Sequence, residues 1–223
     1  KDLAEMGNLY NIVKSKHYIQ RLIEEGEHEH QDFKFQISDA RKIARSISAF
    51  ANNDGGRLLI GVKDNGNIAG IESDEEIYMI EQAASMFCRP PQNVEFKIYR
   101  VDGKNVLKVD IKPSRIRPVK AQDDDKKWRA YYRVGDENIL AHPLHVKLWL
   151  HNRNNDGAQF TYGEIVHEII NRAKRQGSIT IEDCMKELHI SKQIAEQSII
   201  ALCSVGTLAM HYEGNKFIIS PGT

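Results

Sequence analysis

Basic and aromatic residues are concentrated in one stretch in the middle of the chain. Between Lys104 and Lys120 there are six basic residues and a single acidic one, Asp110. The stretch that follows holds Lys126, Lys127, Trp128, Arg129, Tyr131 and Tyr132, with Asp123–Asp125 offsetting part of the charge. Cations beside aromatic rings can follow a phosphate backbone and stack on bases. We therefore predict a nucleic-acid contact, with Lys112, Arg115, Arg117 and Lys120 as candidates. The alternative is a solvated hairpin and loop whose lysine stems cover apolar surface.

Two histidines near the N-terminal end raise the question of a metal site. His28 and His30 alternate with Glu27 and Glu29, and on a strand both imidazoles would lie on one face. No third histidine or cysteine follows at a recognised ligand spacing. We therefore interpret the segment as an exposed, polar entry into a strand.

Several catalytic motifs are absent from the sequence. It contains no GxxxxGK[ST], HExxH or GxSxG, and the missing first motif argues against a Walker-type ATPase. Gly55-Gly56 follows a predicted helix rather than preceding one, so it cannot present a helix N-terminus to a phosphate in the usual way. We interpret this pair as a helix stop and a tight entry into a strand.

The composition is that of an ordinary globular protein, with 41% hydrophobic and 28% charged residues. Its 31 basic and 31 acidic residues cancel, which argues against a generally cationic protein but not against a local basic patch. No apolar run approaches the about 18 residues of a membrane span, and the first residues lack the apolar segment of a signal peptide. Cys88, Cys184 and Cys203 are odd in number and far apart. We therefore expect a cytoplasmic protein with no membrane partner.

The pattern up to residue 151 predicts an α+β fold in which helices pack on a mixed β-sheet. Apolar residues at helical spacing from Leu9 to Ile23 predict an N-terminal helix or helix pair that ends before Gly26. Ser38 is the predicted cap of a helix over 39–52. Arg57–Lys63 is nearly all apolar, as in a strand buried on both faces. The other expected elements are strands over 30–36, 68–71, 94–101, 105–112 and 128–134 and helices over 74–87 and 143–150.

A polar, asparagine-rich segment over 152–160 predicts a linker to a smaller domain over 161–223. The pattern of this domain is helix, short helix, turn, helix and β-hairpin, which is typical of a winged helix. The expected helices cover 161–176, 181–188 and 191–205, and the hairpin strands cover 207–212 and 216–219. Thr180 with Asp183, and Ser191, are the predicted starts of the second and third helices.

The third helix of this domain would be the recognition helix if the domain binds DNA. It would then present Lys192, Gln193 and Gln197, although Glu196 lies among them. Many winged helices serve instead in docking or dimerisation, so a homodimer is an open alternative.

Separated motifs occur in a fixed order from Glu27 onward. After Glu27 come Asp32-Phe33-Lys34, Ala49-Phe50-Ala51-Asn52-Asn53-Asp54-Gly55-Gly56, Gly61-Val62-Lys63-Asp64-Asn65-Gly66, Ile68-Ala69-Gly70 and, further on, Tyr131-Tyr132-Arg133-Val134-Gly135 with Asn138. Together they resemble the Schlafen AlbA-like domain family over about residues 20–150. With the N-terminal helix included, we expect such a domain over 1–151. Asp32 departs from the family pattern, which has Glu there.

Nuclease members of that family cleave RNA with a metal held by two Glu and one Asp, which implies Glu27, Asp32 and Asp64 here. Converging carboxylates repel one another, so they usually hold a cation such as Mg²⁺ or Mn²⁺. The helix between the strands that carry Asp32 and Asp64 makes a crossover that could bring those strands together. Glu27, at an odd separation from Asp32, needs a bend to reach the same face. Without a metal, Asp32 would be ion-paired, Asp64 a turn residue and Glu27 a solvated charge.

Two basic residues belong to the same implied site. Lys34 lies on the strand face of Asp32 and would contact a scissile phosphate or, without metal, Asp32 itself. Arg133 lies inside a family motif and would bind phosphate or pair with Asp64.

Three functions remain in competition. The favoured one is a nucleic-acid-binding protein without a cofactor, specifically a DNA-binding transcriptional regulator, with RNA as the other candidate partner. The alternative is an endoribonuclease that depends on Mg²⁺ or Mn²⁺. The third is a nucleotide or interaction module, for which no residue supports a phosphate loop. The neutral charge, the Asp32 departure and the attached winged helix favour the first.

Overall fold

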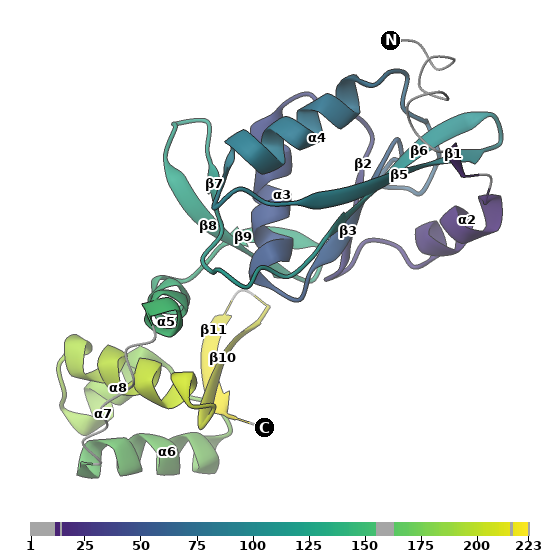
Figure 1. Ribbon diagram of the computed structural model, residues 1–223. Coiled ribbons are helices and arrows are strands. Elements are labelled where there is room, and N and C mark those ends of the chain that lie inside the picture. The colour runs from purple at the N-terminus through teal and green to yellow at the C-terminus, as the bar shows by residue number, and fades with distance from the viewer. Residues whose placement is uncertain (1–11, 14, 155–162, 215, 223) are drawn as a thin grey trace. The chain divides into compact units, whose positions relative to one another are not determined.

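The computed structural model describes residues 12–13, 15–154, 163–214 and 216–222 (Figure 1). The chain divides into two compact units, Lys1–Ala141 and His142–Thr223. The hydrophobic clusters formed by the described residues each lie within one unit. Each unit therefore has the separate core that is expected of a domain.

The first unit is built on a mixed five-stranded sheet. In order across the sheet, its strands are β1 (Ile12–Val13), β5 (Val94–Val101), β6 (Lys104–Ile111), β3 (Gly56–Ile60) and β2 (Gln31–Lys34). The two outer pairs, β1 with β5 and β2 with β3, are parallel, whereas the inner pairs are antiparallel. Helix α3 (Ala40–Asn52) connects β2 to β3, as a parallel pair requires.

Both faces of this sheet are covered. Leu58 and Ile60 of β3 pack with α3 and α4 (Glu75–Met86), whereas Leu59 packs on the other face with α2 (Lys16–Glu24). All three side chains are fully buried. Burial of such a side chain contributes about 1.5–3 kcal/mol, so the apolar run from Arg57 onward has the two-faced burial predicted for it.

A second sheet in the first unit is antiparallel and lies against α3 (Figure 1). Its strands, in order, are β4 (Cys88–Arg89), β7 (Lys120–Gln122), β8 (Trp128–Val134) and β9 (Glu137–Leu140). Ala121 and Tyr131 point inward and join the cluster that includes α3. Because successive residues of a strand point to opposite faces, Lys120 and Trp128 point away from α3.

Two asparagines at the end of α3 bind the second sheet. The amide of Asn52 donates to the carbonyls of Val119 and Tyr131, both at 2.8 Å, and its oxygen accepts from the Val119 N–H at 2.8 Å. Asn53 donates to the Arg133 carbonyl at 2.9 Å and accepts from its N–H. These bonds satisfy buried backbone groups, which explains the paired asparagines in the Ala-Phe-Ala-Asn-Asn motif.

The second unit consists of helices and one hairpin. Its elements are α5 (Pro143–Asn154), α6 (Glu164–Gln176), α7 (Ile181–Leu188), α8 (Lys192–Ser204), β10 (Leu208–Glu213) and β11 (Lys216–Pro221). Thr180 and Asp183 form a capping box at α7, and the Ser191 hydroxyl accepts from the Ile194 N–H at α8. The predicted order of three helices and a hairpin is confirmed for the described residues.

The predicted α+β class is confirmed, but four local predictions need correction. Ile12–Val13 form a strand rather than a helix, because they pair with β5. The residue that caps α3 is Asp39, whose carboxylate accepts from the Arg41 N–H at 2.9 Å, and not Ser38. The segment 68–71 forms only isolated bridges, at Ile68 and Ile71.

The fourth correction concerns the boundary between the units. The helix expected to end at residue 150 runs to Asn154 and falls in the second unit. Its Leu144 is buried in the second core, and its Lys147 pairs with Glu196 of α8 at 2.5 Å. The division therefore precedes α5, and residues 152–154 of the expected linker are helical. The rest of that linker lies outside the described residues, as do Leu9 and Thr161.

No helix among the described residues is both long enough and apolar enough to cross a membrane.

Candidate functional site

Glu27 and Asp32 lie side by side, but Asp64 does not join them. Asp64 is exposed in a turn after β3, which is closed by bonds from Lys63 N–H to the Asn67 carbonyl and from Gly66 N–H to the Lys63 carbonyl. Across the described ranges, no three His, Cys, Asp or Glu side chains are grouped so that they could hold a metal ion. The implied three-carboxylate site for Mg²⁺ or Mn²⁺ is therefore not assembled, and the residues present do not fit the cation.

Asp32 is instead neutralised within the protein. It is buried, its Oδ2 lies 2.8 Å from Nζ of Lys34, and its Oδ1 lies 3.8 Å from Nη2 of Arg133. The hydroxyl of Ser46 also faces it at 3.4 Å. The ion pair with Lys34 agrees with the metal-free prediction, because residues two apart on a strand share a face.

Glu27 is not the solvated charge that was the alternative expectation. Its Oε1 accepts from the Phe33 N–H at 2.9 Å. Burial raises the pKa of Glu27, and a hydrogen bond to the Asp32 carboxyl raises it further. A nearby carboxyl group favours the protonated form of Glu27. We call Glu27 and Asp32, which share this hydrogen bond, the carboxyl pair.

The ring of each of the two histidines contacts a backbone group. Nδ1 of His28 accepts from the His30 N–H at 3.1 Å, and Nδ1 of His30 lies 3.0 Å from the Gly55 carbonyl oxygen. These contacts agree with a polar entry into β2.

Arg133 is not available to nucleic acid. Only 1% of it is exposed, and its guanidinium donates to the carbonyls of Gln31 (3.0 Å) and His28 (3.2 Å) and to the side chain of Asn138 (3.1 Å). The predictions that it contacts phosphate or pairs with Asp64 are therefore wrong. Arg133 joins β8 to the start of β2, and its bond to Asn138 accounts for their spacing in the family motif.

The loop after β6 offers fewer free cations than its sequence indicates. Lys112 is exposed but forms an ion pair with Glu95. Arg117 is half-buried and donates to the Asn53 carbonyl at 2.6 Å. Arg115 is exposed and Lys120 half-buried, and neither forms an ion pair with any residue that the structure describes.

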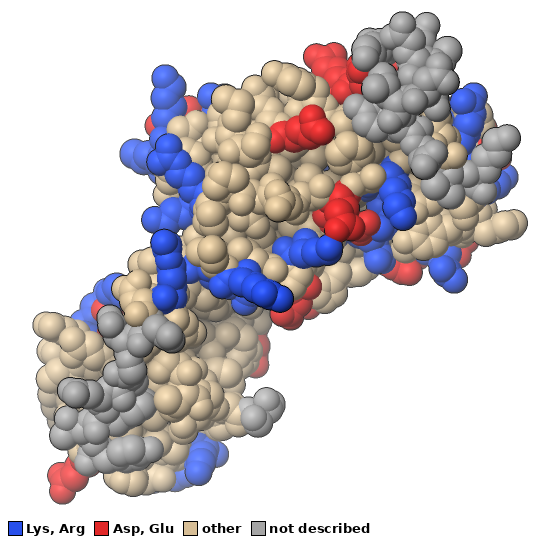
Figure 2. Space-filling model, viewed as in Figure 1, with Lys and Arg blue, Asp and Glu red and all other residues tan. Residues whose placement is uncertain are grey.

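A basic, aromatic surface lies on the outer face of the second sheet. Arg89 of β4 stands directly opposite Lys120 of β7, and Gln122 of β7 stands opposite Trp128 of β8. The guanidinium carbon of Arg89 lies 3.9 Å from the centroid of the Trp128 ring. We call Arg89, Lys120 and Trp128 the basic sheet face. Figure 2 shows Lys and Arg side chains gathered over the end of the first unit that carries β7 and β8.

The two cations of this face differ from the neighbouring Arg129 in their ion pairing. Neither Arg89 nor Lys120 forms an ion pair within the described ranges, whereas nearby Arg129 is bound by Asp123 and Asp125. Like charges directly opposite one another on neighbouring strands are destabilising. A bound anion would relieve that repulsion.

Sequence reasoning missed Arg89. It stands in Arg89-Pro90-Pro91, which indicated only the end of a helix. Its strand pairs with a segment about thirty residues away, and no local periodicity reports such a pairing.

The Schlafen, AlbA_2 family model matches residues 27–142, which is more than half of the chain. The chain belongs to this family. The match contains the whole basic sheet face and ends beside the boundary between the two units.

Among solved structures, this AlbA_2 chain is similar to the DIP2311 protein of Corynebacterium diphtheriae, with 21% identity and a TM-score of 0.44 over 78% of this chain. It spans only 32% of that protein's length. It is also similar to the N-terminal domain of a RecG-related protein of Nitrosomonas europaea, with 18% identity and a TM-score of 0.40, over 59% of this chain and 97% of that domain. No curated protein matches it.

Outside the AlbA_2 region, α8 presents the polar residues predicted for it. Lys192, Gln193 and Gln197 are all exposed. Glu196, which would repel a phosphate, is largely covered and paired with Lys147. The exposed surface of α8 is therefore less acidic than its sequence indicates.

Proposed function

We propose that this AlbA_2 protein binds nucleic acid through the basic sheet face and the adjoining loop with Arg115. The observation that carries the proposal is the Arg89–Lys120 pair beside Trp128. Two cations that form no ion pair with a described residue attract a phosphate backbone, and the half-buried indole can stack on a base.

The finer proposal is that the protein is a DNA-binding regulator whose second unit acts as a winged helix. The order of α6, α7, α8 and the β10–β11 hairpin supports it, as does the exposure of Lys192, Gln193 and Gln197 on α8. In such a module this helix enters the major groove. RNA is the other candidate partner of the sheet face, since stacking and phosphate contacts are available with either polymer.

The nuclease alternative depends on a cation held by Glu27, Asp32 and Asp64. Its three carboxylates are not grouped in the structure, and Asp32 is already paired with Lys34. We therefore do not propose cleavage.

Fluorescence anisotropy tests the proposal with labelled single-stranded and duplex DNA and with RNA of matched sequence. We expect Trp128→Leu to weaken single-strand binding by about tenfold, since stacking on one base contributes about 1–3 kcal/mol. Arg89→Ala should weaken binding to all three. The matched control is Arg100→Ala, which removes an exposed arginine near the β5–β6 turn, away from β4 and β7. Equal affinities for Arg89→Ala, Arg100→Ala and the unmodified protein would overturn the proposal.

A further inference from the structure

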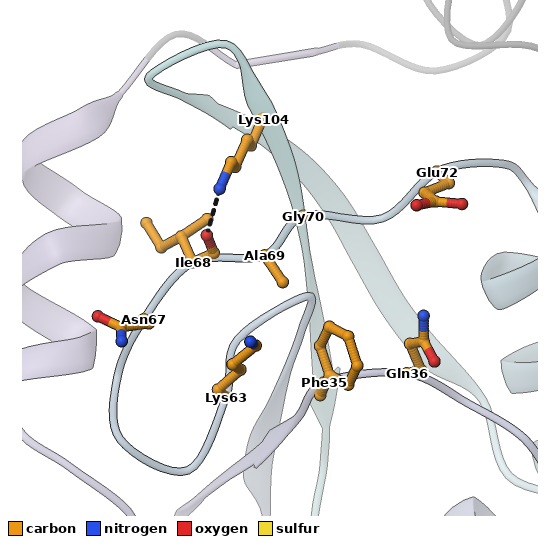
Figure 3. A pocket seen from close by; sticks show the side chains of 9 residues that line it. All are labelled: Phe35, Gln36, Lys63, Asn67, Ile68, Ala69, Gly70, Glu72 and Lys104. Carbon is orange, nitrogen blue, oxygen red and sulfur yellow. Dashed lines mark hydrogen bonds between the residues drawn. The ribbon is translucent and has the colours of Figure 1, made fainter.

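We propose that a second site in the first unit binds a nucleoside phosphate. A hollow of about 580 Å³ opens where β2 ends, and its lining includes Phe35, Lys63, Gly70, Glu72 and Lys104 (Figure 3). Small-molecule sites occupy about 300–1,000 Å³. None of the residues of the basic sheet face lines this hollow.

One wall of the hollow is a closed loop that two glycines make possible. The Gly61 carbonyl accepts from the N–H groups of both Ala69 (2.8 Å) and Gly70 (2.9 Å). Gly61 and Gly70 have φ of +89° and +86°, and a Cβ on Gly61 would lie 2.8 Å from the Gly70 carbonyl carbon. This loop is therefore fixed before any ligand arrives, which lowers the entropy cost of binding.

Two lysines supply positive charge on one side of the hollow. Lys63 and Lys104 are both exposed, and neither is paired with a carboxylate of the described residues. Lys104 donates to the Ile68 carbonyl at 2.8 Å, which uses one of its three N–H donors. Figure 3 shows both side chains on the same side of Phe35. Each of them can contact an anionic group of a ligand in the hollow.

An exposed aromatic ring lies beside the lysines. Phe35 is 43% exposed, and Nζ of Lys63 lies 5.1 Å from the centroid of its ring. A flat apolar ring that faces solvent next to a cation offers a stacking surface for a nucleobase whose phosphate binds that cation.

The opposite side of the hollow carries hydrogen-bond acceptors. Gln36 lies beyond the Phe35 ring as seen from Lys63, and Glu72 lies on the same side of the hollow as Gln36 (Figure 3). They can accept from ribose hydroxyls or from an amino group of a base. A cationic side, a ring and an acceptor side match the three parts of a nucleoside phosphate.

Two kinds of ligand carry a nucleoside phosphate: a free mononucleotide and the phosphorylated end of a nucleic-acid strand. Isothermal titration calorimetry of the full chain separates them. The first arm titrates adenosine 5′-monophosphate. The second titrates a short oligodeoxynucleotide with a 5′-phosphate and the same strand without it.

We expect Lys63→Ala and Phe35→Leu each to weaken binding by about tenfold, through loss of a charge-assisted contact and of stacking. Lys42→Ala, which removes an exposed lysine outside the hollow, should leave the affinity unchanged. Thermal unfolding of each variant checks the fold, and the exposure of both side chains predicts little change.

Binding of the mononucleotide that depends on Phe35 and Lys63 supports the free ligand. If only the binding of the phosphorylated strand depends on Phe35 and Lys63, the ligand is the phosphorylated strand end. The proposal is overturned if neither ligand binds, or if binding is the same in Phe35→Leu, Lys63→Ala and Lys42→Ala. Arg89→Ala should retain mononucleotide binding, so failure of the sheet face and failure of this site are distinguishable.

Discussion

At the residue scale, the charged groups of the AlbA_2 motifs serve mainly to join segments. Arg133 connects β8 to the backbone at the start of β2, and Lys34 neutralises Asp32. Loss of one member of a buried ion pair leaves an uncompensated charge. Contacts within the fold therefore account for the presence of Arg133 and Lys34 in these motifs.

The carboxyl pair predicts a pH dependence of stability. Because the pKa of Glu27 is raised from 4.5 in the folded protein, its protonated form contributes stability that is complete below 4.5 and lost as the pH rises through the raised value. Glu27→Gln resembles the protonated form. We expect this variant to be more stable than the unmodified protein at neutral pH.

Urea unfolding at neutral and acidic pH measures this effect. The difference in midpoint between Glu27→Gln and the unmodified protein should shrink below pH 4.5. A variant that is less stable at neutral pH would show that the ionised Glu27 carboxylate is favourable.

Sequence reasoning identified local charge contacts and missed distant ones. The Lys34–Asp32 pair follows from their separation on one strand. The burial of Arg133 does not, because its partners at residues 28 and 31 lie about a hundred positions earlier. The Arg89–Lys120 pair depends in the same way on a strand pairing between distant segments.

At the element scale, the cap of α3 gives a direct test. Asp39 accepts from the Arg41 N–H, whereas Ser38 is exposed and precedes the capping position. We expect Asp39→Ala to lower the free energy of unfolding by about 1 kcal/mol. Ser38→Ala is the control and should change it by less than about 0.5 kcal/mol. If chemical denaturation shows that Ser38→Ala is more destabilising than Asp39→Ala, Asp39 is not the cap of α3.

Elements with strong local signals were predicted closely. β8 and α7 have the predicted bounds, since one is rich in strand-forming residues and the other begins at a capping box. The spacing of Ile12 and Val13, in contrast, predicts a helix. Their parallel partners in β5 are more than eighty residues away, and this tertiary pairing overrides the local preference.

At the scale of the whole molecule, the boundary before α5 predicts which fragments fold. Leu144 of α5 is 1% exposed in the second core, and the hydroxyl of Tyr212 accepts from the His142 N–H at 2.8 Å. We expect a fragment of residues 142–223 to unfold cooperatively, because its core is intact. A fragment that begins after Asn154 loses about 1.5–3 kcal/mol from Leu144 alone.

Thermal unfolding followed by circular dichroism compares the two fragments. The shorter fragment should melt at a lower temperature or without a cooperative transition. Equal melting temperatures would mean that α5 adds nothing to the second unit and would favour the boundary predicted from sequence.

The most direct test of nucleic-acid binding by the sheet face is the salt dependence of affinity. Each neutralised phosphate contributes about 0.7–0.9 to the slope of log K against log salt. We predict that the double variant Arg89→Ala, Lys120→Ala binds single-stranded DNA more weakly, with a slope smaller by roughly 1.5. An unchanged slope together with an unchanged affinity would show that these cations do not contact phosphate, and would contradict the account.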